Sequence, residues 1–137
     1  MYFEKPGKQN TEETVNIALQ AAKELGIDTI VVATNTGDTA DLLKDAARSG
    51  LHVVAVSHCF GFKDPEVQEM PAERKAALEA AGIQVVTVDY HKMSLENHLR
   101  STRILGALLG RQEVAEELCR RYQGGIDLVN ERLSTLS

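Results

Sequence analysis

The sequence has no tryptophan, only three prolines and two cysteines, and no surplus of positive charge. The two cysteines, Cys59 and Cys119, are far apart and form neither a CxxC motif nor a disulfide framework, which favours reduced thiols. Fifteen Lys and Arg stand against 20 Asp and Glu, giving a net charge of −5. A general nucleic-acid binder needs a basic surplus to neutralise phosphates, so DNA and RNA are not expected as main partners.

Long hydrophobic runs are also absent. No stretch approaches the ~20 apolar residues of a membrane span, and the segment from Met1 to Lys8 lacks the apolar core of a signal peptide. We therefore expect a cytoplasmic protein without a membrane partner. The length of 137 residues, with 43% hydrophobic and 26% charged residues, predicts a single globular domain over residues 1–137.

Short apolar strands alternate with helices as far as Val88. Strands are predicted at 29–33, 51–56 and 84–88, and helices at 10–25, 38–48 and 71–81. Asn10 and Glu13 form a capping-box pattern at the start of the first helix, and Gly26 ends it. Helices between buried strands imply parallel pairing with right-handed crossovers. The expected fold is a three-layer α/β/α sandwich with a mainly parallel sheet.

The remainder of the chain carries helical patterns only. We expect helices at 94–109, 112–122 and 127–136, interrupted at Gly110 and at Gly124-Gly125.

Ligands of open parallel sheets bind beyond the carboxyl ends of the strands. The first strand leads into Thr34, Asn35, Thr36, Gly37, Asp38 and Thr39, which supply hydroxyls, an amide and a glycine. Gly37 permits close approach of a ligand, and the following helix start favours an anion. An ordinary turn capped by Asp38 or Thr39 explains the pattern equally well, and the Asp38 carboxylate counts against a bound phosphate.

A second polar segment follows the second strand, in a loop of about 14 residues of a kind that is often functional. His58 can donate a hydrogen bond or act as an acid or base, and Lys63 can pair with a phosphate. Phe60 and Phe62 can pack on a ligand ring, but anchoring of the loop is the simpler interpretation. Cys59 and His58 are neighbours in an extended segment and point opposite ways, which argues against a catalytic pair.

No metal site or complete catalytic set is evident. His91 and His98 are seven residues apart, and two histidines without a third ligand indicate solvated side chains rather than a metal centre.

The order of several short motifs resembles a family of small prokaryotic proteins related to the C-terminal α/β domain of pyruvate kinase. The motifs are Tyr2-Phe3-Glu4-Lys5-Pro6-Gly7, Asn10-Thr11-Glu12-Glu13-Thr14, Gly37-Asp38-Thr39-Ala40, His58 with Gly61-Phe62, and Met70-Pro71. The resemblance covers about Tyr2 to Leu105 and implies the fold of that domain, with a five-stranded mixed sheet.

The resemblance also implies a ligand. In some pyruvate kinases the loop equivalent to 34–40 holds the phosphate of a sugar-bisphosphate effector. The family of small prokaryotic proteins looks like a family of binding proteins for a phosphate-bearing ligand. Flavin mononucleotide (FMN) is one candidate for that ligand. By this analogy Lys5, Asn10 and Thr11 border the pocket as well. Gly61 and Phe62, from the motif that includes His58, are further candidates for ligand binding.

The chain departs from its relatives after Val88, where two further strands are expected and none is predicted. In the pyruvate-kinase strand order, the first strand would then expose an apolar edge, which proteins avoid. We expect the C-terminal helices or a second copy of the chain to cover it, and we favour a homodimer through the C-terminal region.

Three functions remain open from the sequence. The first is a binding domain for a phosphate-bearing ligand, FMN or a sugar phosphate, without chemistry of its own. The second is a small flavin-dependent or sugar-phosphate enzyme that uses His58, assisted by Asp89 or His91. The third is an interaction module with an apolar stripe, formed by Leu118, Leu128, Val129 and Leu133.

Overall fold

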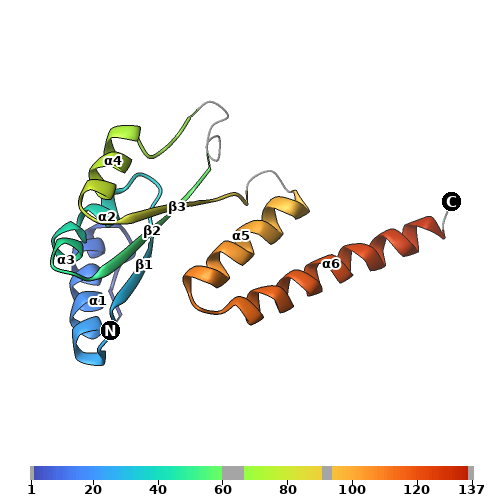
Figure 1. The fold of residues 1–137 in the computed structure, drawn as a ribbon, viewed down its shortest axis with the longest axis horizontal. Helices are drawn as coiled ribbons and strands as arrows, with labels where there is room; N and C mark the ends of the chain where they lie inside the picture. Colours follow the sequence, from blue (N-terminus) through green and yellow to red (C-terminus); the bar gives the residue numbers. More distant parts are fainter. Residues whose placement is uncertain (1, 60–66, 91–93, 136–137) are drawn as a thin grey trace. The chain divides into compact units, whose positions relative to one another are not determined.

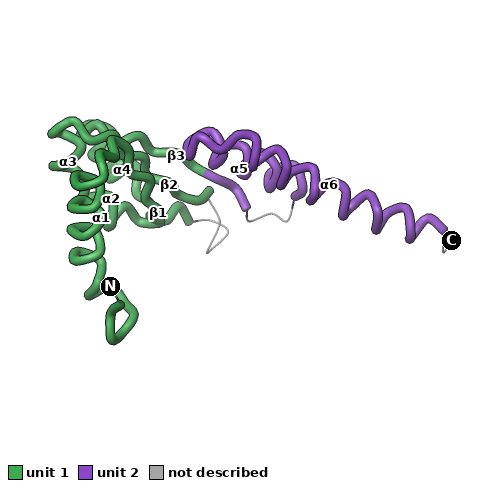
Figure 2. The backbone as a smooth tube through the Cα atoms, turned by 90° about the horizontal axis from the view of Figure 1, so that it is seen from below, with its two compact units in different colours: residues 1–87 green, residues 88–137 purple. Residues whose placement is uncertain are grey.

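A computed structural model describes residues 2–59, 67–90 and 94–135. The chain divides into two compact units, residues 1–87 and residues 88–137 (Figure 2). The first unit contains the part of the chain in which helices and strands alternate. Its elements are η1 (Lys8–Asn10), α1 (Thr11–Leu25), β1 (Thr29–Ala33), α2 (Asp38–Asp41), α3 (Lys44–Arg48), β2 (His52–His58), α4 (Ala72–Ala80) and β3 (Gln84–Val88).

The three strands form one parallel sheet in the order β1-β2-β3 (Figure 1). Ile30 of β1 lies opposite Val53 of β2, and Val32 lies opposite Ala55. The ladder continues one residue past β1, where the Thr34 N–H donates to the Val56 carbonyl at 2.9 Å. Among the described residues, β1 pairs only with β2 and so ends the sheet on its side.

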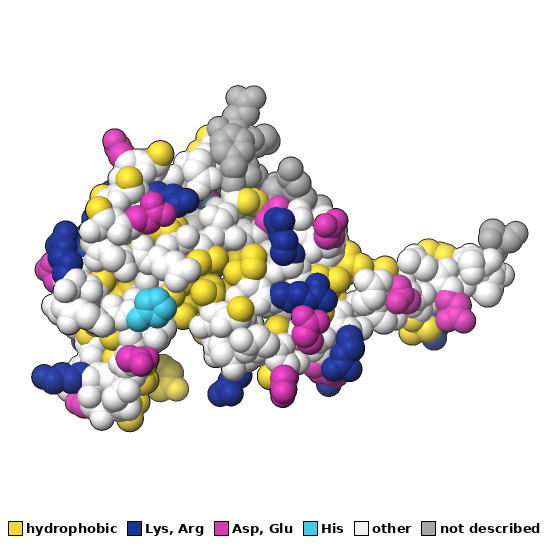
Figure 3. Space-filling model, in the orientation of Figure 1, with side chains coloured by type: hydrophobic (Ala, Val, Ile, Leu, Met, Phe, Trp, Pro, Cys, Tyr) yellow, Lys and Arg dark blue, Asp and Glu magenta, His cyan; other side chains and the backbone are white. Residues whose placement is uncertain are grey.

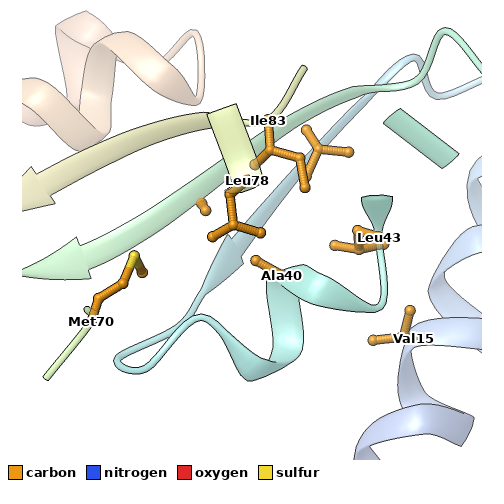
Figure 4. Close-up of a cluster of buried hydrophobic side chains, with 8 residues drawn as sticks. Val15, Ala40, Leu43, Met70, Leu78 and Ile83 are labelled. Carbon is orange, nitrogen blue, oxygen red and sulfur yellow. The ribbon is translucent and has the colours of Figure 1, made fainter. Parts of the chain in front are cut away.

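One face of this sheet packs against helices of the first unit. Val53 and Ala55 of β2 are fully buried there, together with Leu78 of α4. The other buried members of the cluster are Val15, Ala40, Leu43, Met70 and Ile83, most of which are labelled in Figure 4. Removal of these side chains from water is the main stabilising contribution to the unit. The turn after β1 starts from this packed layer, which fixes the position of the loop.

The second unit is a helical hairpin of α5 (Leu95–Leu108) and α6 (Gln112–Ser134). Gly106 of α5 packs directly against Ala115 of α6, and Arg103 donates from Nε to Glu116 Oε1 at 2.7 Å. Gly110 turns the chain between the helices with a φ of 62°. None of the helices in the described part of the chain has the length and apolar character needed to cross a membrane.

The α/β class, with parallel strands and without the later strands, is confirmed. The predicted strands 29–33 and 84–88 are also confirmed, as is the end of α1 at Gly26, which has a φ of 66°. The second strand was predicted too short, because it continues to His58. The helix predicted for 38–48 is interrupted by a turn between α2 and α3.

Two further predictions were wrong. Asn10 makes no side-chain capping bond; its Nδ2 donates instead to the Lys5 carbonyl at 2.6 Å. Gly124 and Gly125 do not interrupt the last helix, since α6 runs through both.

Candidate ligand site

A pocket of about 570 Å³ opens at the carboxyl end of β1. Its volume is within the range usual for small-molecule sites. Most of the loop predicted from the sequence contributes to it, together with two segments from elsewhere in the first unit. The lining residues are Lys8, Thr11, Glu12, Ala33, Thr34, Asn35, Thr36, Asp38, Thr39, Leu42 and Glu69.

The loop itself is held by an internal hydrogen bond. Thr34 is buried, and its Oγ1 accepts from the Gly37 N–H at 3.1 Å. The same residue continues the β1–β2 ladder through its backbone N–H. The sheet therefore anchors the first residue of the loop, and that residue fixes the turn that presents Asn35, Thr36 and Thr39.

Gly37 has a structural role that the sequence did not show. It does not line the pocket; it occupies a φ of 94°, which side-chain-bearing residues rarely adopt. A Cβ at this position would lie 2.5 Å from Cδ of Arg74, whose side chain crosses beneath the turn. The backbone conformation and the Arg74 side chain of α4 therefore both require a glycine at this position.

The Asp38 carboxylate, which counted against anion binding, is already satisfied by protein groups. The Thr36 hydroxyl donates to it, and Arg74 Nη1 donates to Oδ1. Lys8 Nζ lies 3.7 Å from Oδ2. The Thr36 hydrogen bond, followed by the hydrogen bond and charge of Arg74, lowers the pKa of Asp38 below its ordinary value. Arg74 also pairs with Asp41 at 2.9 Å, so it ties two carboxylates of α2 to α4.

His58 meets a partner that sequence reasoning missed. Its Nε2 lies 2.9 Å from Oε2 of Glu69, and both side chains are mostly buried, at 13% and 16% exposure. Glu69 lines the pocket, so this pair connects the end of β2 to the site. Glu69 lies outside every motif in the sequence, and only the three-dimensional fold brings it to His58.

The N-terminal segment supplies another wall of the pocket. Thr11, implied by the resemblance, lines it, and so do Lys8 and Glu12, which were not predicted. Lys5 and Asn10 do not line it, although the bond from the Asn10 amide to the Lys5 carbonyl holds the segment in place.

Several predicted residues do not contribute described atoms to the site. Gly61, Phe62 and Lys63 lie outside the described residues, as do Phe60 and His91. Asp89 belongs to the second unit, where its Oδ2 accepts from Asn97 Nδ2 at 2.8 Å. Within residues 2–59, 67–90 and 94–135, no three His, Cys, Asp or Glu side chains are grouped to hold a metal ion.

The sequence profile of the family described as "Pyruvate kinase, alpha/beta domain" matches residues 12–123. The chain belongs to this family. In this pyruvate kinase α/β domain the matched region includes the loop at 34–39, His58 and Glu69. Lys8 and Thr11, which line the same pocket, precede the match, and the last turns of α6 follow it.

Proposed function

We propose that this pyruvate kinase α/β domain binds a small phosphate-bearing ligand in the pocket at the end of β1, without chemistry of its own. The main support is the set of donors gathered there. Thr39 from the loop, Thr11 from α1 and the ammonium of Lys8, which carries three N–H donors, line one pocket. Hydroxyl groups and a cation are suitable donors for phosphate oxygens.

A sugar phosphate suits the described lining better than a flavin. Apolar contact for a planar ring comes only from Ala33 and Leu42 among the described lining residues. The carboxylates of Glu12 and Glu69 are acceptors suited to ligand hydroxyl groups. FMN remains the alternative that the experiment below separates.

An enzymatic role for His58 has one specific observation in its favour. A histidine held by a carboxylate is the arrangement of a positioned acid or base. The His58–Glu69 pair has that form and reaches the pocket through Glu69. The corresponding test is turnover of any ligand identified, with and without His58→Gln.

The first experiment is native purification followed by an absorbance spectrum and mass spectrometry of released small molecules. A hexose bisphosphate, FMN and inorganic phosphate are then titrated by calorimetry. Thr39→Asp places a negative charge in the lining and is expected to abolish binding of the phosphate-bearing probe. Asn16→Asp adds the same charge on an exposed residue of α1 outside the lining and is expected to leave binding unchanged.

Binding that survives Thr39→Asp would contradict the proposed site. No affinity for any of the three probes, with nothing released from the purified protein, would contradict the proposed function. A yellow protein that releases FMN would identify the ligand as a flavin rather than a sugar phosphate.

A further inference from the structure

The C-terminal half of α6 has little to pack against within its own unit. Tyr122 near the middle of α6 still contacts α5, since its ring lies 4.4 Å from that of His98. Every described residue from Arg120 to Thr135 is exposed. Gly124 and Gly125 also weaken the helix, by about 1 kcal/mol each relative to alanine. A helical segment of this length is marginal in water unless an apolar face is buried.

Such a face is present on this segment. Tyr122, Ile126, Val129 and Leu133 follow one another at alternating spacings of four and three residues, as in the seam of a coiled coil. All four are between 44% and 58% exposed. Hydrophobic side chains are visible along the part of α6 that extends past α5 (Figure 3). We call Ile126, Val129 and Leu133 the ridge.

The same unit contains a matching depression, which we call the groove. It has a volume of about 320 Å³ and lies between α5 and the first half of α6. The α5 side is formed by His98, Thr102 and Leu105, with Leu109 just after the helix, and the α6 side includes Val114, Leu118 and Tyr122. The stretch of α5 from His98 to Leu109 and the stretch of α6 from Tyr122 to Leu133 have equal length, about 16 Å at 1.5 Å per residue.

We propose that the ridge of one copy of this chain lies in the groove of a second copy, and that the second ridge fills the first groove. Groove and ridge are on the same helix, and Tyr122 belongs to both surfaces, so the face is continuous. Two copies related by a two-fold axis near Gly124 and Gly125 bury both surfaces in one isologous interface. Gly125 shares a helix face with Tyr122 and Val129, which are three and four residues away, and the absence of a side chain there permits close approach of the two α6 helices.

Charge favours the same arrangement. A two-fold axis runs the two α6 helices antiparallel and brings the carbonyl end of each toward the start of the other. Arg111, the one charged residue in the described groove lining, lies at that start. A cation beside the free carbonyls of a helix end is stabilising.

The test is the molar mass of the full chain at micromolar concentration, by size exclusion with light scattering. The wild type is expected at twice the chain mass of 15.0 kDa. Val129→Asp, in the ridge, and Leu109→Asp, in the groove, are each expected to give the single-chain mass. Both residues are more than half exposed, so neither change removes a buried core contact. Leu128→Asp is the matched control, because Leu128 is 48% exposed on α6 but lies outside the ridge.

Mixing the two monomeric variants distinguishes this interface from a simple pairing of ridges. The Val129→Asp chain keeps its groove and the Leu109→Asp chain keeps its ridge, so one of the two contacts reforms and a heterodimer is expected. A monomeric wild type, a Val129→Asp protein that stays dimeric, a Leu128→Asp protein as disrupted as Val129→Asp, or no heterodimer on mixing would each overturn the proposal.

Discussion

Arg74 of α4 passes so close beneath Gly37 that a Cβ at position 37 would lie 2.5 Å from its Cδ and 2.9 Å from its Cγ. The turn that presents the pocket loop and the helix that follows β2 are therefore fitted to one another. The two Arg74 ion pairs, to Asp38 and Asp41, hold the same contact from the charged end of the side chain.

Gly37→Ala is expected to destabilise the first unit by more than Gly50→Ala. Both glycines have a positive φ, 94° and 102°, so each alanine incurs a backbone cost of about 1–2 kcal/mol. Only Gly37 has a side chain in the way, since nothing lies within 4 Å of a Cβ at Gly50. Urea unfolding of both variants measures the difference. Equal unfolding midpoints would contradict the claim that the Arg74 side chain leaves no room for a Cβ at position 37.

The carboxyl group of Asp38 should make stability depend on acid pH. Its folded pKa is lowered, so its contribution is present above the ordinary carboxyl value of 3.8 and is lost as the pH falls through the folded value. Thr36→Val removes the largest cause of the shift and should raise the Asp38 pKa, measured by carbon-detected NMR titration. Thr87→Val, on an exposed residue of β3, is the control. An unchanged Asp38 pKa in Thr36→Val would contradict the assigned cause.

Alanine substitution at two helical glycines should act in opposite directions. Gly106→Ala is expected to destabilise the hairpin, because the new Cβ would lie 2.3 Å from that of Ala115. Gly124→Ala meets nothing within 4 Å and should stabilise α6 by up to about 1 kcal/mol. Thermal unfolding followed by circular dichroism compares them. A Gly106→Ala protein as stable as the wild type would show that the helices separate easily.

Ser101→Ala should cost about 1–3 kcal/mol, since it removes two hydrogen bonds to the part-buried backbone of Asp89. Ser101 is only 1% exposed. Its hydroxyl accepts a hydrogen bond from the Asp89 N–H at 2.8 Å and donates one to the Asp89 carbonyl at 3.0 Å. Ser49→Ala removes an exposed hydroxyl bonded to the Asp45 carbonyl and should change stability by less than about 0.5 kcal/mol. Denaturant unfolding decides, and equal effects would contradict the role of Ser101.

Local patterns were sufficient for the parts of the fold that local physics determines. Continuous β-branched runs predicted β1 and β3, and the loop at 34–39 followed from the rule that ligands bind at carboxyl strand ends. Thr34, Thr36 and Thr39, which that rule selected, line the pocket at the end of β1. Family resemblance added Thr11, which no local pattern identifies as a lining residue.

Interactions between distant segments were not predictable in the same way. Glu69 meets His58, and Arg74 meets Asp38, only because β2 and α4 are brought to the loop by the sheet. The Asn10 amide has two possible partners, its own helix or the Lys5 carbonyl, and the sequence does not show which wins. Gly124-Gly125 looked like a break because propensity alone ignores what the helix on either side gains by continuing.

The pocket also has consequences for how the protein is produced. Lys8, the one basic residue among its described lining, comes from the short segment that precedes the family match. A recombinant protein that begins after Lys8, through a late start codon or through cleavage, would keep the sheet and still be recognised as a pyruvate kinase α/β domain. Its pocket would nevertheless be wider and would have lost its cation, and we expect binding assays on such material to underestimate affinity for the proposed phosphate-bearing ligand.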